Sequence, residues 1–179
     1  MSVRLTATAS LDVTETVAAV YAPASPADGV ANTRRFSSYN QVNKTLTGTT
    51  TPKADTVVDL SFALSGGTTK SFDLTAAPDA KNIADTVDLT GKKLVALLIY
   101  ADPDNHASGV TMESGAANGY DFLGDAAYGL TLYPGMAVNM FQLGAAAGLD
   151  AVGASDKALD FVGTDGDVIQ CLAVFGTQA

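Results

Sequence analysis

The chain has 179 residues, of which 47% are hydrophobic and 16% are charged, and its formal net charge is −9 at pH 7. This length predicts one domain with an extended arm, and the hydrophobic content is sufficient for a packed core. The low charged fraction indicates that a protein partner covers part of the surface. The negative charge argues against nucleic-acid binding, which requires a basic face to displace counterions from phosphates.

Cys171 is the only cysteine and His106 is the only histidine. An intrachain disulfide is therefore excluded, and so is a zinc site built from cysteine and histidine. Cys171 lies in the apolar segment 168–175, which predicts a small buried thiol and not a nucleophile. No apolar run reaches the roughly 18 residues of a membrane span, so we expect no membrane partner. The first residues lack the pattern of a signal peptide, which predicts synthesis in the cytoplasm without export by the general secretory route.

The first 33 residues differ in composition from the remainder and predict an arm. Residues 3–8 alternate between apolar and polar, which predicts a strand, and residues 13–20 predict a second one. Residues 22–29 are rich in proline, alanine and serine and have no core pattern, which is typical of a linker. We therefore predict an arm over residues 1–33 and a β-sandwich domain over residues 34–179.

The next segments predict strands of increasing apolar character. Residues 34–46 predict a polar strand, and residues 58–64 alternate with the period of two that a half-buried strand requires. Ser65-Gly-Gly67 predicts a tight turn, and residues 71–75 alternate again. Residues 58–75 therefore predict a β-hairpin, and residues 76–84 predict a connector with one helical turn.

Residues 87–100 form the most distinctive stretch of the sequence. Asp88-Leu-Thr-Gly91 predicts a turn, and an unbroken apolar run follows over residues 94–100. An apolar run of this length between turn signals is typical of a strand buried on both faces. Asp102-Pro-Asp-Asn105 ends it at once. We expect this segment to be the central strand of the domain.

The C-terminal half predicts further short strands, at residues 107–113, 129–133, 136–143, 157–162 and 168–175. Glycine-rich or proline-containing turns separate them, among them Pro134-Gly135. The whole chain then has about nine to eleven strands and no sustained helical periodicity. This pattern predicts an all-β fold, a two-layer sandwich of jelly-roll type.

Two acidic loops resemble metal sites at first sight. Asp102-Pro-Asp-Asn-His106, which contains Asp102 and Asp104, and Asp165-Gly-Asp167 both offer the oxygen ligands that calcium favours. Neither has the spacing of an EF-hand, and these residue types are also common in turns. We therefore predict turns and no metal or cofactor. Asp156 and Asp160 are expected at the surface.

The sequence contains no recognisable catalytic constellation, so we predict that the protein is not an enzyme and has no catalytic residues. Glycoside hydrolysis needs two carboxylates across a cleft, and here no acid lies in an evidently buried pattern and no tryptophan offers a sugar platform. No Gly-x-Ser-x-Gly elbow surrounds a serine that could use His106. Gly115-Ala-Ala-Asn-Gly119 lacks the Lys-Ser/Thr and the helix of a phosphate loop. The aromatic residues at positions 120, 122, 128 and 133 are expected to anchor the core and an interface, and a ligand patch is the less favoured interpretation.

The order of motifs in the C-terminal half resembles that of small virion proteins of tailed bacteriophages, of the head-decorating or capsid-cement type. The motifs are Asp88-Leu-Thr-Gly91 before an apolar strand, Gly115-Ala-Ala-Asn-Gly-Tyr120, Leu132-Tyr-Pro-Gly135, Asp160-Phe-Val-Gly-Thr164 and a closing apolar strand. The resemblance implies a structural protein on the outer capsid surface, with the major capsid protein and further copies of itself, as a homotrimer, as partners. It implies no catalytic residues.

Two other functions fit the same sequence features. One is another virion component, such as a vertex spike, a head-fibre base or a tail protein. The other is a carbohydrate-binding β-sandwich, which the absence of tryptophan and of an export signal disfavours.

Overall fold

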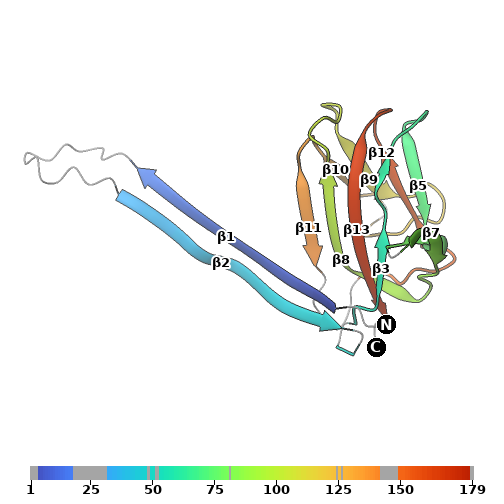
Figure 1. Ribbon diagram of the computed structural model, residues 1–179, viewed down its shortest axis with the longest axis horizontal. Coiled ribbons are helices and arrows are strands. Elements are labelled where there is room, and N and C mark those ends of the chain that lie inside the picture. Colours follow the sequence, from blue (N-terminus) through green and yellow to red (C-terminus); the bar gives the residue numbers. More distant parts are fainter. Residues whose placement is uncertain are drawn as a thin grey trace, which may run out of the picture. The chain divides into compact units, whose positions relative to one another are not determined.

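The computed structural model describes residues 4–17, 32–47, 49–50, 53–80, 82–123, 125, 127–141 and 149–177 (Figure 1). The chain divides into two compact units: Thr6–Thr45 is one, and Met1–Leu5 together with Leu46–Ala179 is the other. The predicted division into an arm over residues 1–33 and a domain over residues 34–179 stays a prediction.

The first unit is a ribbon of two β-strands, β1 (Arg4–Val17) and β2 (Asn32–Thr47). They run in opposite directions (Figure 1). β1 joins the two strands predicted at residues 3–8 and 13–20, because no glycine or proline interrupts the residues between them. β2 covers the predicted polar strand at residues 34–46, and β1 is its sheet partner. The predicted linker at residues 22–29 lies outside the described residues.

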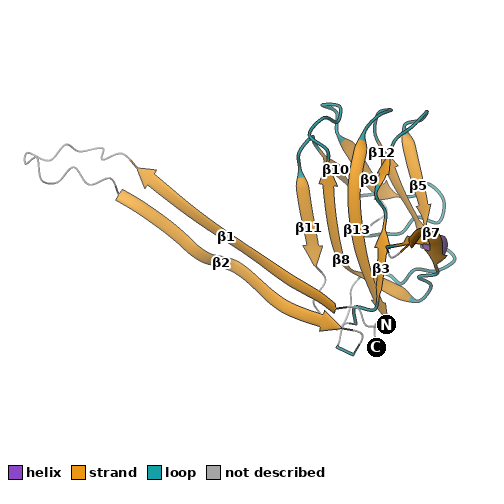
Figure 2. Cartoon of the chain, in the orientation of Figure 1, coloured by secondary structure: helices purple, strands orange, loops and turns teal. Residues whose placement is uncertain are grey.

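The second unit is a sandwich of two antiparallel sheets that pack against each other (Figure 2). The smaller sheet has the strand order β10-β9-β12-β5, and the larger has the order β11-β8-β13-β3-β6-β7 with β4 beside β13. The strands of the sandwich are β3 (Thr56–Asp59), β4 (Phe62–Ala63), β5 (Thr69–Asp73), β6 (Ala77–Asp79), β7 (Asn82–Val87), β8 (Lys92–Ala101), β9 (Val110–Ser114), β10 (Gly129–Leu132), β11 (Ala137–Phe141), β12 (Ala158–Val162) and β13 (Val168–Thr177). The predicted all-β two-layer sandwich is confirmed, and its jelly-roll connectivity stays a prediction.

The described residues contain thirteen strands, more than the sequence predicts. The excess comes from short pieces such as β4 and β6, which have two and three residues and lack a recognisable alternation. The helical turn expected within residues 76–84 is a 3-10 turn at Leu74–Ala76, and the predicted connector that follows it consists largely of β6 and β7.

The predicted hairpin over residues 58–75 is wrong. β3 and β4 pair with β13, whereas β5 pairs with β12 in the other sheet. The turn at Ser65-Gly-Gly67 therefore carries the chain from one sheet to the other, and Gly66 adopts the left-handed φ of 70° that this reversal uses. The arch brings Phe62 and Phe72 together across the core, with ring centroids 5.9 Å apart. Burial of aromatic side chains between the sheets thus takes the place of the backbone pairing of a hairpin.

The apolar run at residues 94–100 forms β8, which lies between β11 and β13 and is second from the edge of the larger sheet. The prediction of a central strand buried on both faces is therefore only partly right. Leu97 and Ile99 are buried in the core between the sheets. Leu98, on the opposite face, is 48% exposed. The sequence run is uniformly apolar, but only one of its faces has a second layer over its whole length.

A β-bulge near the start of β8 connects the larger sheet to a loop of the smaller one. Ala96 pairs with Val174 and Leu94 with Phe175, so that Val95 has no partner in the register. The backbone N–H of Leu94 donates to the hydroxyl of Tyr120, at 3.0 Å. Tyr120 is completely buried, and this burial raises its pKa to about 12. The tyrosine hydroxyl therefore satisfies a buried backbone donor at the bulge.

We expect Tyr120→Phe to lower the free energy of unfolding by about 1–3 kcal/mol, because the buried N–H of Leu94 would lose its acceptor. Urea unfolding followed by far-ultraviolet circular dichroism measures this change. Tyr133→Phe is the matched control, since Tyr133 is 57% exposed and its hydroxyl can bond to water. Equal stability of the two variants would contradict the proposed role of the Tyr120 hydroxyl.

Candidate functional site

The outer face of the larger sheet carries side chains in regular cross-strand rows. The middle row runs from Asn139 on β11 through Leu98 on β8 and Leu172 on β13 to Asp59 on β3. Side chains directly opposite each other in antiparallel strands share a face. Leu98 and Leu172 are 48% and 41% exposed, so two leucines stand side by side at the surface with polar residues at either end of their row.

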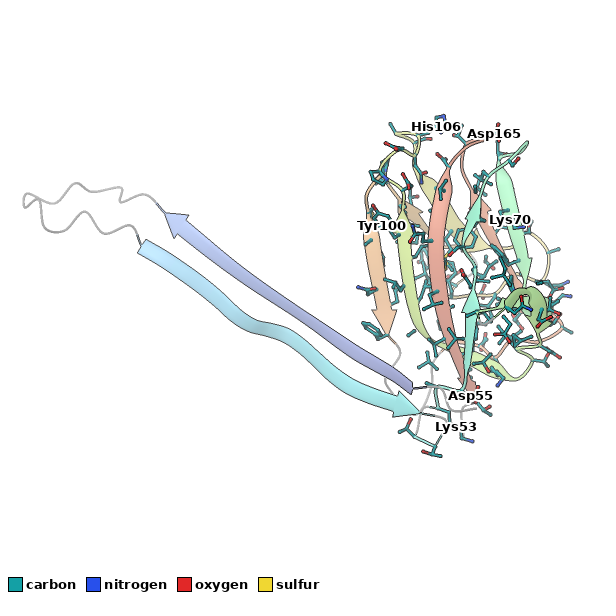
Figure 3. All side chains as sticks on the ribbon, viewed as in Figure 1. Lys53, Asp55, Lys70, Tyr100, His106 and Asp165 are labelled. Atoms are coloured by element: carbon teal, nitrogen blue, oxygen red, sulfur yellow. The ribbon has the colours of Figure 1, made fainter. Side chains whose placement is uncertain are left out.

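On one side of these leucines the next cross-strand row is buried or partly buried, and on the other side the next row is partly exposed. The first of these rows forms a small apolar cluster of its own with Val95 and Ala54. Its members are Phe141, Ala96, Val174 and Val57. The other row contains Tyr100, which is half-buried and pairs with Gln170. Leu98, Tyr100 and Leu172 are hereafter called the outer stripe; Tyr100 is labelled in Figure 3. The outer stripe is the main apolar surface of this face within residues 53–177 as described.

A buried carboxylate organises the loops at one end of the sandwich. Asp167 is completely buried, although no acid was expected in a buried position from the sequence. It accepts hydrogen bonds from the backbone N–H groups of His106 and Thr164, at 2.8 and 2.7 Å, and its Oδ1 lies 2.9 Å from Nδ1 of His106. Burial alone would raise the pKa of Asp167, but these hydrogen bonds outweigh it and hold the pKa below the usual value for aspartate. The arrangement ties the loop after β8 to the loop before β13.

The other acids of this end also serve as acceptors in turns. The Oδ1 of Asp102 accepts from the backbone N–H of Asp104, at 2.9 Å, and the Oδ1 of Asp165 accepts from that of Gly66, at 2.7 Å. Figure 3 places His106 and Asp165 at the same end of the sandwich. Within the described residues, no group of three or more histidine, cysteine or acidic side chains could hold a metal ion. In the two acidic loops, the side chains of Asp102, Asp165 and Asp167 thus accept hydrogen bonds from backbone N–H groups at this end of the sandwich.

The Gly115–Gly119 motif forms a tight loop against β12. Gly119 makes an isolated bridge to Ala158, and the Cβ of a larger residue at Gly115 would lie 2.5 Å from the Cβ of Ala158. Asn118 has a φ of 55°, and its carbonyl accepts from the N–H groups of Lys157 and Ala158. The glycines are therefore explained by close backbone contact.

Two ion pairs of the sandwich join strands to loops. Lys92 Nζ lies 2.6 Å from Oδ1 of Asp55, and Lys157 Nζ lies 2.9 Å from Oδ2 of Asp73. Hydrogen bonds from Thr75 and Lys157 lower the pKa of Asp73 to about 2. For Asp55, burial opposes the shift, but the bonds from Lys92, Thr56 and Thr177 lower its pKa. Asp55 is partly buried and Asp73 is exposed, and each carboxylate accepts hydrogen bonds from a lysine and from threonine, which suits a structural role.

The remaining residues singled out in the sequence separate into core and surface. Tyr120 and Phe122 are buried, whereas Tyr128 and Tyr133 are 60% and 57% exposed, so the four aromatic residues do not form one patch. Cys171 is buried, as predicted, and burial followed by the charge of Asp59 raises its pKa to about 12. A thiol with such a pKa is not a nucleophile at neutral pH.

The fold and its surface define an all-β sandwich, with a two-stranded ribbon as a separate unit. Comparison with protein-family models gives no match to this chain, and comparisons with curated proteins and with solved structures give none either. In the part of the chain that is described, no helix has the length and apolar character needed to cross a membrane.

Proposed function

We propose that the protein is a structural component of a tailed-bacteriophage particle, a decoration or cement subunit that binds the outer surface of the capsid and stabilises the head. Its partners are the major capsid protein and other copies of itself, arranged as a homotrimer. The mechanism is packing of a preformed β-sandwich onto the assembled shell, with the N-terminal arm as an anchor. Binding only to the assembled shell stabilises it by mass action.

The outer stripe is the observation that carries this proposal. Leu98 and Leu172 occupy the middle of a sheet face and stay 48% and 41% exposed, although the other face of the same strands is fully covered. An apolar centre with a polar border, here Asn139 and Asp59, is typical of a protein interface. A surface of this kind supports a function that depends on binding another protein.

The chemistry of the described side chains supports the same proposal. The most deeply buried acid, Asp167, is used to fix loops, and Cys171 is an inert buried thiol. The low charged fraction of 16% and the order of the C-terminal motifs add to this support. The net charge of −9 keeps free subunits soluble before they assemble.

Sedimentation with capsids tests the proposal. Heads of the phage that encodes the chain, assembled without it, are mixed with the full-length protein and pelleted. We expect the protein to sediment with the heads at a fixed ratio, and electron cryomicroscopy to locate it on the outer capsid surface. Protein that stays in the supernatant, or density confined to a tail or vertex, would contradict the decoration role.

Removal of residues 1–30 tests the anchoring role of the arm in the same assay. This deletion removes β1, so we expect fewer bound copies per head than with the full chain. Unchanged occupancy would show that the arm is not the anchor. Circular dichroism of the free variant controls for retention of the sandwich.

A further inference from the structure

The covalent connection from the ribbon to the sandwich leads directly into β3. The ribbon strand β2 ends at Thr47, and β3 begins at Thr56. Lys53 and Asp55, just before β3, lie at the end of the sandwich opposite to His106 (Figure 3). Tension on the N-terminal arm therefore reaches the sandwich along the chain at the start of β3.

By itself, β3 is a short attachment. Each of its four residues pairs with β13, beginning with Thr56 opposite Phe175. On the other side of β3, the register with β6 contains Val58 alone. Because β3 and β13 are antiparallel and β13 ends where β3 begins, tension between the arm and the C-terminus separates the two strands one pair at a time. The contacts just before Thr56 are the first to resist this separation.

The carboxylate of Asp55 accepts hydrogen bonds from two other strands at this point. Its Oδ1 accepts from Nζ of Lys92 at 2.6 Å and from Oγ1 of Thr56 at 2.9 Å. Its Oδ2 accepts from the backbone N–H and from Oγ1 of Thr177, both at 3.3 Å. Lys92 and Thr177 are cross-strand partners at the start of β8 and the end of β13. Asp55, Thr56, Lys92 and Thr177 are hereafter called the Asp55 clamp.

Backbone contacts and packing reinforce the Asp55 clamp. The backbone N–H of Asp55 donates to the carbonyl of Phe175, at 3.1 Å. Ala54 is completely buried in the small apolar cluster of the larger sheet. The Cβ of a larger residue at Gly176 would overlap the carbonyl oxygen of Lys53. The incoming chain therefore lies directly against the end of β13.

The environment of the Asp55 clamp makes it stronger than a fully exposed ion pair. The side chains of Lys92 and Asp55 are 24% and 25% exposed. Fully exposed ion pairs contribute little, whereas salt screens partly buried charges less, and hydrogen bonds to charged groups are stronger than neutral ones. Burial would raise the pKa of Asp55, but the bonds from Lys92, Thr56 and Thr177 outweigh it and lower the pKa, so the carboxylate is ionised at neutral pH.

We propose that the Asp55 clamp is the mechanical fastening of the N-terminal arm: it holds the chain before β3 on the ends of β8 and β13, so that tension on the arm is shared by these strands. This inference rests on the anchoring role of the arm in the proposed function. An arm that holds a subunit on a capsid transmits force only as far as its own attachment withstands it. The Asp55 clamp provides that attachment where β3 alone is short.

Single-molecule pulling on the full chain tests the Asp55 clamp. One handle is attached at Asn40→Cys on β2 and the other at the C-terminus, while Cys171 is buried and does not react. We expect Asp55→Asn to shorten the lifetime of the sandwich under constant tension at neutral pH about tenfold or more, because the ion pair with Lys92 is lost. Asp73→Asn is the matched control. Asp73 also accepts bonds from a lysine and a threonine, but it lies at the end of β5 in the smaller sheet, and we expect a much smaller change.

A second pulling axis separates a mechanical fastening from a general contribution to stability. Handles at Asp104→Cys and Tyr128→Cys, two exposed positions on either side of β9, apply tension to β9 in the smaller sheet. We expect Asp55→Asn to shorten the lifetime much less along this axis than through the arm. Equal shortening along both axes, or none through the arm, overturns the inference. If Asp55→Asn does not fold, Lys92→Met removes the same ion pair, keeps an apolar stem of similar length and is subject to the same two measurements.

The outcomes also separate this inference from the decoration role. If the full chain sediments with heads but Asp55→Asn has the lifetime of the wild type through the arm, only the Asp55 clamp is contradicted. If the chain does not sediment with heads but Asp55→Asn shortens the lifetime selectively through the arm, the Asp55 clamp is supported and only the decoration role is contradicted.

Discussion

Phe161→Ala is expected to lower the free energy of unfolding by about 3–5 kcal/mol, the usual range for removing a buried phenylalanine ring. Phe161 is completely buried on β12, between β5 and β9. Its ring lies 5.0 Å from that of Phe62 and 5.9 Å from that of Phe72, in an edge-to-face arrangement with the second. The substitution would open a cavity where the two sheets meet and would remove two aromatic contacts at once.

Urea unfolding followed by far-ultraviolet circular dichroism measures this loss, since the chain has no tryptophan to report on the core. Tyr128→Ala is the control; Tyr128 is 60% exposed, and we expect a change within about 0.5 kcal/mol. If Phe161→Ala does not fold, Phe161→Leu leaves a smaller cavity and measures the same effect. A Phe161→Ala variant as stable as the Tyr128 control would contradict this position of Phe161 in the core.

The strands of the C-terminal half could be predicted from the sequence because local signals define them. The segments expected at residues 129–133 and 168–175 correspond to β10 and β13 within two residues. In each case an alternating or apolar run lies next to residues that favour turns. Pro134-Gly135 follows β10, and Asp165-Gly166 precedes β13. Such signals act over a few residues and do not depend on the partner strand.

The pairing of strands could not be predicted, because it depends on the core. The turn at Ser65-Gly-Gly67 is compatible with a hairpin and with an arch between sheets. The arch forms because it brings Phe62 and Phe72 together around Phe161. The same limitation applies to β8, whose sequence does not reveal that Leu98 faces outwards in a row without a second layer. The exposure of the outer stripe therefore follows from the pairing of the strands and cannot be read from the apolar run in the sequence.

The role of Asp167 was also missed, because its partners are distant in the chain. His106 lies 61 residues away, and only the local bond to the N–H of Thr164 has a signal in the sequence. Threonine three residues before an aspartate, with Asp165-Gly166 between them, is a turn pattern that could have indicated a side chain folded back on the backbone. It gives no indication that the carboxylate is buried.

Asp167→Ala is expected to lower the free energy of unfolding by at least about 3 kcal/mol, because hydrogen bonds to a charged group contribute about 1.5–3 kcal/mol each and two backbone donors would lose their acceptor. Asp167→Asn should cost less, since the amide oxygen can still accept one of these bonds. Urea unfolding at neutral pH measures both changes. Asp104→Asn is the control, because Asp104 is exposed and lies in the loop that Asp167 holds in place.

The stabilisation that Asp167 provides is expected to decrease as the pH falls. The pKa of Asp167 is lower in the folded protein than in the unfolded chain, where it is about 4, so the unfolded state binds more protons between the two values. The contribution of Asp167 is therefore complete above about pH 4 and is lost as the pH falls through the lower, folded pKa. The stability difference between the wild type and Asp167→Asn should shrink below about pH 4, whereas Asp104→Asn should follow the wild type throughout. A difference that is constant from about pH 3 to pH 7 would contradict a role for the ionised carboxylate.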